Sequence, residues 1–171
     1  MGHKSPVTLT PPRPDSLPVE RPSAARRLLL RFLSFYPPFV GAGIRVRRLP
    51  GDPPGYETRL RLRFWNRNYH GTHFGGAIYT MCDPFYVLII AAELGSGYAV
   101  WDKKSTVRFL RPGRGTLHAR FEVAREKIEL MRVAADAGER LEPTFIAEVR
   151  NEAGELVAEV EKVLSVRRRT G

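Results

Sequence analysis

The chain has 171 residues, one cysteine and a formal net charge of +10 at neutral pH. This length suits a single domain that buries about 70% of its unfolded surface, and the lone Cys82 excludes an intrachain disulfide, which fits a cytoplasmic protein. We expect neither a secretory signal nor a membrane span, because no segment has the order of a signal peptide and the apolar runs are short.

Positive charge is concentrated in the first half of the chain. Residues 21–63 hold ten arginines against two acidic residues, whereas residues 122–161 hold eleven acidic against five basic residues. Two such halves can complement each other in an oligomer, or the basic half can attract an anionic ligand. No RNA-reading motif or zinc-finger spacing occurs, so we expect no nucleic-acid partner.

Proline punctuation divides the chain into three parts. Residues 1–22 hold six of the fourteen prolines and are predicted to be a disordered tail. Residues 23–168 form the domain, and residues 169–171 are a basic tail. The domain begins with a short amphipathic helix over residues 23–36, which Pro37 and Pro38 are expected to end.

Alternating apolar and polar residues predict about six strands. The first two, over residues 44–49 and 56–65, are separated by a turn rich in proline and glycine. The remaining strands are expected over residues 98–110, 117–123 and 145–149, and from residue 156 onwards. A surface helix over residues 125–137 ends at Gly138.

One long apolar stretch organises the rest. From Gly75 to Leu94 the only charged residues are Asp83 and Glu93, which predicts a helix buried on nearly every side. Pro84 should kink this helix, or leave Asp83 to cap a second helical segment. The predicted fold class is therefore α+β, with an antiparallel sheet around one long central helix and a short N-terminal helix.

The start of the central helix has features of a reactive site. The first N–H groups of a helix lack partners within it and can polarise a carbonyl, and glycine at 75 and 76 lets a ligand approach the backbone. Asp83 can serve as a base or nucleophile, but it lies about 12 Å along the helix from Gly75. Since one helix cannot bring both groups to one carbonyl, the site requires a second, antiparallel copy, and we expect at least a dimer.

Two histidines, His70 and His73, lie in the loop before this helix. They suit substrate binding or acid–base chemistry, whereas a metal site is not expected because no further ligands follow at metal spacing. No serine-hydrolase elbow, dinucleotide motif or phosphate-binding loop occurs, and Cys82 lies in an apolar run, so a thiol nucleophile is not expected.

The segment Asn68-Tyr69-His70-Gly71-Thr72-His73-Phe74-Gly75-Gly76, with Asp83 seven residues later, resembles the hot-dog fold acyl-CoA thioesterases of the phenylacetate-pathway (PaaI) type, including a tetrameric branch. The resemblance covers about residues 25–168. It implies a thioesterase of medium-chain or aromatic acyl-CoA that assembles as a homodimer or a dimer of dimers. Coenzyme A would enter only as part of the substrate, with no separate cofactor.

The resemblance also implies roles for individual residues. Gly75 or Gly76 would polarise the thioester carbonyl, Asp83 of the neighbouring subunit would activate water or attack, and Asn68 would place the water or the carbonyl. Substrate contacts are expected from His70, Thr72, His73, Phe74 and Tyr79. The phosphates of coenzyme A are expected to meet Lys103, Lys104, Arg108, Arg111 and Arg114.

One departure matters, because the family usually has histidine before the glycine pair, where this chain has Phe74. Two alternatives stay open. Pairing of His73 with Asp83 would suit an acyl dehydratase or hydratase, although the characteristic Pro-Gly loop is missing. The chain could also bind an acyl-CoA or acyl chain without turning it over.

Overall fold

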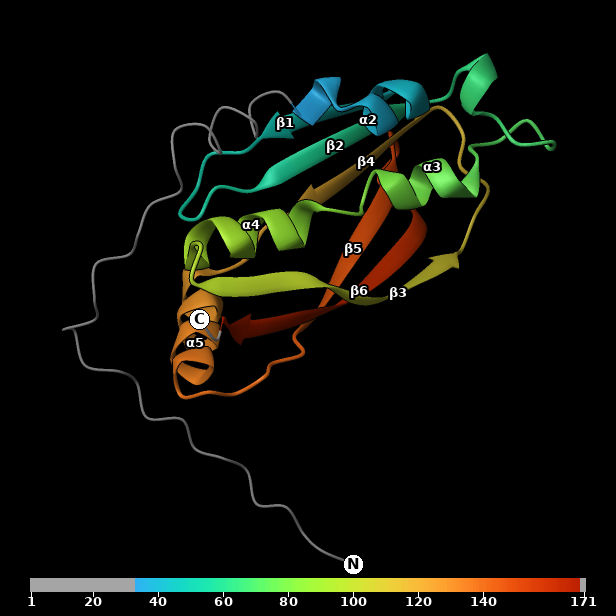
Figure 1. Cartoon of the computed structure of the whole chain (residues 1–171). Helices are drawn as coiled ribbons and strands as arrows, with labels where there is room; N and C mark the ends of the chain where they lie inside the picture. Colours follow the sequence, from blue (N-terminus) through green and yellow to red (C-terminus); the bar gives the residue numbers. More distant parts are fainter. Residues whose placement is uncertain (1–32, 170–171) are drawn as a thin grey trace, which may run out of the picture.

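The structure is a computed structural model that describes residues 33–169 (Figure 1). One sheet curls around the consecutive helices of residues 75–80 and 85–94, and the helix of residues 125–136 lies at one end of the sheet. In chain order the elements are η1 (Leu33–Phe35), α2 (Pro37–Ala42), β1 (Ile44–Arg48), β2 (Tyr56–Arg61), η2 (Phe64–Asn66), α3 (Gly75–Thr80), α4 (Phe85–Leu94), β3 (Tyr98–Phe109), β4 (Thr116–Phe121), α5 (Arg125–Asp136), β5 (Thr144–Asn151) and β6 (Leu156–Arg168).

All neighbouring strands in the sheet are antiparallel, and their order is β1-β2-β4-β5-β6-β3. The longest pairing joins β3 to β6, from Tyr98 opposite Arg168 to Phe109 opposite Ala158. A bulge between Asp102 and Lys104 shifts the register of β3. Because β1 and β3 stand at the two edges, the long strand β3 has one side without a partner within the described sheet.

The core lies between the sheet and the central helices. The Phe85 ring of α4 stacks on Phe39 of α2 and on Phe121 of β4, with centroids 5.9 and 4.6 Å apart. Inward residues of the sheet, such as Leu60 and Val160, are fully buried against the same helices. The predicted α+β fold, six antiparallel strands around a central helical segment with a short N-terminal helix, is confirmed.

The described part of the chain has one segment long and apolar enough to cross a membrane, Gly75–Leu94. This segment is the pair of central helices, α3 and α4, and half of it is buried inside the molecule. Its apolar character is accounted for by the core that it forms with the sheet.

The central segment is not one continuous helix, because it breaks before Pro84. Helix α3 ends at Thr80, and α4 begins at Phe85 with the Leu88 N–H donating to the Pro84 carbonyl (2.9 Å). Proline lacks an N–H group, so the helical ladder stops where it stands. Pro84 itself occupies the N-cap position without a side-chain hydrogen bond. Of the two predicted alternatives, the interruption of the helix at Pro84 is confirmed, and Asp83 is not the N-cap of α4.

The N-terminal prediction is corrected at the two prolines. Residues 23–32 of the expected helix lie outside the described residues, and residues 33–35 form a 3-10 turn. Pro37 and Pro38 begin α2 instead of ending a helix. The first turn of a helix has no use for its N–H groups, so a residue without one fits there.

The second strand is shorter than predicted, ending at Arg61 where residue 65 was expected. The buried Asn66 side chain causes this ending. Its Nδ2 donates to the carbonyls of Arg61 (2.9 Å) and Ala42 (3.1 Å), while its Oδ1 accepts from the Arg63 N–H (2.7 Å). These bonds replace the ladder bonds of a longer strand and turn the chain into η2.

Candidate active site

The loop before α3 is shaped by the side chain of Asn68. Its Nδ2 donates to Thr72 Oγ1 (2.9 Å) and to the His73 carbonyl (3.2 Å). Its Oδ1 accepts from the N–H groups of His70 (2.9 Å) and Thr72 (3.1 Å). The Asn68 amide thus fixes the loop that leads into α3, and its predicted contact with water or the carbonyl stays a prediction.

Two aromatic rings lie against the glycines that begin α3. A Cβ on Gly75 would stand 3.0 Å from the ring of Phe109, and one on Gly76 would collide with the ring of Phe74. A side chain at either position would therefore displace one of these two exposed rings from its present place. Among residues 33–169, the N–H groups of Gly75 and Gly76 donate to no backbone acceptor, which leaves them available to a ligand oxygen.

His73 is a buried neutral imidazole, only 2% exposed. Its Nε2 lies 3.1 Å from the Gly115 carbonyl, so this nitrogen carries the hydrogen. Its Nδ1 is buried and has no hydrogen-bond partner in the described part of the chain. Burial lowers the pKa of His73 below its ordinary value, and the hydrogen bond to Gly115 offsets this only in part.

A cavity of about 480 Å³ opens beside this loop. Most of the predicted loop residues line it, together with the end of β3 and the turn that follows. The polar residues of its wall are Asn68, His70, Thr72, His73, Arg111 and Arg114. Gly75, Ile78 and Phe109 line it as well. The structure therefore places five of the predicted catalytic and substrate-contact residues around one cavity: Asn68, His70, Thr72, His73 and Gly75.

Asp83 lies elsewhere, paired with a lysine that the sequence analysis overlooked. Its Oδ1 accepts from Lys162 Nζ at 3.0 Å, and the Asp102 Oδ2 atom lies 2.9 Å from the same nitrogen. The Lys162 side chain is fully buried, whereas the Asp83 side chain is 44% exposed. Asp83 is therefore a carboxylate fixed from below by a buried cation and open to solvent above.

The charges in this group shift each other's ionisation. Burial tends to lower the pKa of Lys162, but the hydrogen bonds to Asp102 and Asp83 outweigh it, so that pKa lies above its ordinary value. Burial raises the pKa of Asp102, with Lys162 opposing the change. Asp102 Oδ1 is buried and has no partner within residues 33–169.

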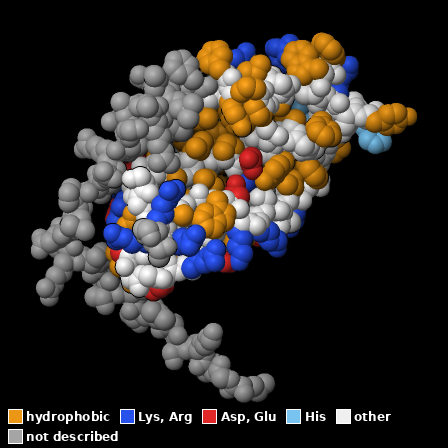
Figure 2. Space-filling view, viewed as in Figure 1, with side chains coloured by type: hydrophobic (Ala, Val, Ile, Leu, Met, Phe, Trp, Pro, Cys, Tyr) orange, Lys and Arg blue, Asp and Glu red, His pale blue; other side chains and the backbone are white. Residues whose placement is uncertain are grey.

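Tyr79 connects the charged group to a second cavity, of about 470 Å³. Its hydroxyl donates to Ser105 Oγ (3.2 Å) and accepts from Lys162 Nζ (3.4 Å). The wall of this cavity is formed by Tyr79, Asp102, Lys103, Lys104, Ser105 and Val107. Figure 2 shows acidic side chains at the surface between the central helices and β3, which is where this group lies.

Lys162 could have been found from the sequence. Residues 160, 162, 164 and 166 alternate with Glu161, Val163 and Ser165, and Val160, Leu164 and Val166 are all buried on the inner face of β6. A lysine that interrupts such a row points into the core, and a buried lysine needs a carboxylate partner. The β3–β6 pairing places Asp102 opposite Leu164. Lys162 lies two residues from Leu164 on the same face of β6, so Asp102 is within reach of it as a second partner.

The five residues predicted to bind coenzyme A do not form one cluster. Arg111 and Arg114 line the cavity with His73, while Lys103 and Lys104 line the cavity with Tyr79. Arg108 is paired with Glu159, and Lys103 is paired with Glu142 (2.5 Å). Lys104, Arg111 and Arg114 form no ion pair among residues 33–169 and are the cations free to meet a phosphate.

Thiol and metal chemistry find no support in the described residues. Burial raises the pKa of Cys82 to about 12, which keeps its sulfur protonated and inert. No three His, Cys, Asp or Glu side chains gather as metal ligands within residues 33–169.

Residues 25–166 match the family described as a domain of unknown function, DUF4442. The chain belongs to this family. The match extends through α2, the central helices and all six strands of the DUF4442 protein. No curated protein matches the chain.

Solved structures place the DUF4442 protein among hot-dog folds. PA5026 from Pseudomonas aeruginosa, a protein of unknown function and probable thioesterase, is 24% identical with a TM-score of 0.70, over 85% of this chain and 94% of that one. The thioesterase HI1161 from Haemophilus influenzae is 18% identical with a TM-score of 0.60, over 81% and 88%. The E. coli PaaI protein, from the phenylacetic acid degradation operon, is 15% identical with a TM-score of 0.56, over 86% and 96%. The predicted resemblance to the hot-dog thioesterases is confirmed at the level of the fold.

Proposed function

We propose that this protein is an acyl-CoA thioesterase that acts on a medium-chain or aromatic acyl group. The observation that carries the proposal is Asp83, a partly exposed carboxylate at the break of the central helix, fixed by the buried Lys162 beside an open cavity. Its support is the hot-dog fold, which the chain shares with proteins named as thioesterases.

The proposed reaction is hydrolysis of the thioester by one water molecule. Asp83 takes a proton as the water oxygen bonds to the acyl carbon, and the carbonyl oxygen gains negative charge that the N–H group of Gly75 or Gly76 stabilises. The C–S bond then breaks, and the proton held by Asp83 passes to the thiolate of coenzyme A. In the alternative form, Asp83 attacks the carbonyl itself and water hydrolyses the resulting anhydride. Neither form requires a cofactor.

The two halves of this machinery line different cavities of the subunit. Gly75 borders the cavity of the loop, whereas Tyr79 and Asp102, the neighbours of Lys162, border the other. Strand β3 contributes to both, Phe109 to the first and Val107 to the second. A reacting carbonyl must lie about 3 Å from both groups, so the proposed site combines the loop of one subunit with Asp83 of its partner.

The edge strand β3 offers a route to this assembly. It is 12 residues long, and one side has no partner within the described sheet, so it can pair with a copy of itself. Two-fold, antiparallel pairing would bring the start of one β3 beside the end of the other. The Asp102 region of one subunit would then meet the Phe109 region of its partner, as the reaction needs.

Lys162 is proposed to position Asp83. Its bond occupies Oδ1 of the carboxylate, and the side chain remains 44% exposed, so Oδ2 can face a water molecule. The unpaired Lys104, Arg111 and Arg114 are the proposed contacts for the phosphates of coenzyme A. The aromatic rings of Phe74 and Tyr79 and the loop residues His70, Thr72 and His73 are proposed to contact the acyl or pantetheine part, with Asn68 behind them.

A non-catalytic acyl-CoA binder is the second candidate, favoured by one observation. Phe74, which is 57% exposed, stands at the position where the family usually has a histidine, and its ring lies directly against Gly76. The dehydratase alternative is weakened because His73 bonds to Gly115 and Asp83 bonds to Lys162, so each has another partner.

Thiol release from short, medium, long and aromatic acyl-CoA thioesters tests the proposal, comparing wild type with Asp83→Asn. We expect turnover of a medium or aromatic thioester by wild type and a loss of about a hundredfold or more in the variant. Asp136→Asn, which removes an exposed carboxylate paired with Arg168, is the matched control and should keep activity.

Oligomeric state and acyl-CoA affinity are measured on the same samples. An Asp83→Asn protein that is folded and assembled and still turns over as fast as wild type would contradict the role of Asp83. Tight acyl-CoA binding by an inert wild type would establish the binding module instead.

A further inference from the structure

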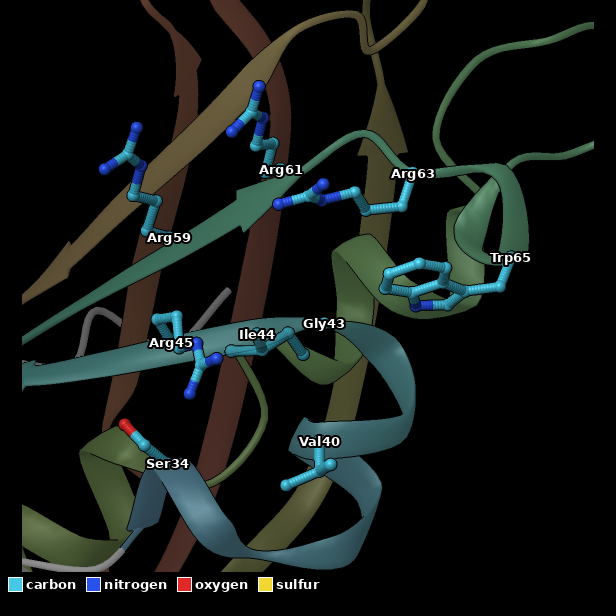
Figure 3. A pocket seen from close by; sticks show the side chains of 9 residues that line it. All are labelled: Ser34, Val40, Gly43, Ile44, Arg45, Arg59, Arg61, Arg63 and Trp65. Atoms are coloured by element: carbon cyan, nitrogen blue, oxygen red, sulfur yellow. The ribbon is translucent and has the colours of Figure 1, made fainter.

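A third cavity, of about 340 Å³, lies at the opposite edge of the sheet between β1, β2 and η2. Four arginines line it, Arg45 from β1 and Arg59, Arg61 and Arg63 from β2 and the turn after it, and Trp65 closes one side (Figure 3). It shares no residue with the two cavities of the candidate active site. Its function is therefore a separate question from thioester hydrolysis.

The sheet register places these arginines at neighbouring positions of β1 and β2. Arg45 stands directly opposite Arg59 in the β1–β2 pairing, and Arg61 follows Arg59 by two residues on the same face. On the other side of β2, His118 stands opposite Arg59. Like charges directly opposite one another destabilise a sheet unless something compensates them.

No acidic side chain within residues 33–169 forms an ion pair with these four arginines, although neighbouring arginines are paired. Arg47 binds Glu57 (2.6 Å) and Arg120 binds Glu122 (3.3 Å). Hydrogen bonding to Thr116 lowers the pKa of Glu152, and the charge of Arg59 contributes less to this shift. Glu152 forms no ion pair with Arg59 among the described residues. The arginines of the cavity thus lack ion pairs within the described residues, whereas their neighbours Arg47 and Arg120 have them.

The walls of the cavity are fixed by buried or paired polar groups. Asn66, 4% exposed, ties the end of β2 to the end of α2 through the Arg61 and Ala42 carbonyls. Ser34 Oγ donates to the Val46 carbonyl (3.1 Å) and accepts from the Val46 N–H (3.0 Å), which holds η1 against β1. The arginine side chains therefore project from a rigid frame.

Arginine recognises phosphate through two parallel N–H donors, and an exposed indole offers a flat face for an aromatic ring. Trp65 is 53% exposed, and Figure 3 shows its indole at the rim of the cavity, beside Gly43. The Arg63 guanidinium lies over this ring, 5.9 Å from its centroid. A volume of about 340 Å³ lies at the small end of ligand sites. Both the charge and the size fit a compact polyanion.

We propose that this cavity binds a small molecule through a diphosphate group held by Arg45, Arg59, Arg61 and Arg63. A free pyrophosphate and the diphosphate of a nucleotide share this chemistry. In the second case the base would contact the exposed indole of Trp65, over which Arg63 now lies. The site goes beyond the thioesterase proposal and does not depend on it.

Titration calorimetry of the full-length protein with inorganic pyrophosphate tests the site, with ADP as a further arm. Pyrophosphate is expected to bind with one site per chain. The double variant Arg59→Gln/Arg61→Gln should weaken it by at least about tenfold for each lost charge-assisted contact. The matched control Arg47→Gln/Arg120→Gln removes the same charge from paired arginines outside the cavity and should change affinity less than about twofold.

Tryptophan fluorescence of Trp101→Phe, which leaves Trp65 as the sole tryptophan, gives an independent readout at the cavity. A change on ligand addition supports the site, and tighter binding of ADP than of pyrophosphate would add the stacking contact. Equal affinity of both would support a site for the phosphates alone.

Three outcomes would overturn the proposal. The first is that wild type takes up neither pyrophosphate nor ADP. Equal losses in the two double variants would mean that only the general positive charge attracts the anion. Binding of a duplex oligonucleotide without binding of pyrophosphate would make this face a nucleic-acid surface. None of these results concerns acyl-CoA hydrolysis, so each proposal can fail without the other.

Discussion

Two regions of this molecule treat charge in opposite ways. At the centre, the fully buried Lys162 lies between Asp83 and Asp102 at 3.0 and 2.9 Å. At the β1–β2 edge, the exposed Arg45 and Arg59 stand opposite each other and form no ion pair in the described part of the chain. The first region brings opposite charges together inside, and the second brings like charges together outside.

The difference follows from solvation. Moving an ion from water into the protein interior costs several kcal/mol of hydration free energy. Without compensation this cost is about as large as the free energy of unfolding of a small domain. Lys162 can therefore exist only with its carboxylates. Exposed arginines keep most of their hydration, so their repulsion costs little and their donors remain free for a ligand. The buried Lys162 is therefore held in place by its ion pairs, whereas the exposed arginines without ion pairs can bind an anion.

Lys162→Met is the strongest way to break this contrast. Methionine fills similar space but leaves Asp83 and Asp102 without a cation, and Asp102 already has one oxygen without a partner. We expect the free energy of unfolding to fall by about 2–4 kcal/mol in chemical denaturation. If Lys162 positions Asp83, kcat for the thioester should fall about a hundredfold with little change in KM.

Lys104→Met, an exposed lysine of β3, is the control and should change stability by less than about 0.5 kcal/mol. Adding Asp102→Asn to Lys162→Met should recover part of the loss. The pH profile gives a further check, because Lys162 has a raised pKa in the folded state. Its contribution should be complete below its unfolded pKa of 10.5 and lost as the pH rises through the higher folded value. An unchanged alkaline profile in Lys162→Met would contradict the pairing.

The sequence predicted the sheet well because strand burial has a period of two. Leu117, Ala119 and Phe121 alternate in the chain, and all three are buried on β4. The glycine pair and Asp83 were also recognisable, as a turn without side chains and as a carboxylate in an apolar run. What these positions had in common was a local signal, readable within a few residues.

The missing parts depend on contacts between distant segments. Asp102 and Lys162 are sixty residues apart in the chain, and only the β3–β6 pairing with its bulge brings them together. The unpaired state of Arg45 and Arg59 follows likewise from the register of β1 and β2. The prediction that Pro37 ends a helix was wrong for another reason. The fixed backbone angle of proline and its missing N–H group suit the start of a helix as well as its end.

His73 lies between the two extremes, as a titratable group that is buried but uncharged. Its folded pKa is lowered below 6.5, chiefly by burial, so the unfolded chain binds a proton more readily than the folded one. The contribution of neutral His73 to the free energy of unfolding should be fully present above about pH 6.5. It should be lost as the pH falls from there through the lower folded pKa, by at most about 1.4 kcal/mol per pH unit.

Denaturation at a series of pH values compares wild type with His73→Gln, whose amide can still donate to Gly115. This variant should lose part of the acid sensitivity. His70→Gln removes an exposed imidazole from the same loop and should keep it. If both variants retain the full acid response, other groups cause it.

The smallest effect belongs to the exposed arginines, and its sign is informative. Arg59→Gln removes repulsion with Arg45, so at low salt it should raise the free energy of unfolding by about 0.2–0.5 kcal/mol. Arg47→Gln removes the same charge from a pair with Glu57 and should lower it by a similar amount. Both differences should vanish near 1 M salt, where the screening length is about 3 Å.

Saturating pyrophosphate should make wild type more stable than Arg59→Gln, because a ligand that binds only the folded state stabilises wild type and not Arg59→Gln. If both substitutions lower stability alike at low salt, Arg59 already has a partner, and the case for an open anion site at this edge is lost.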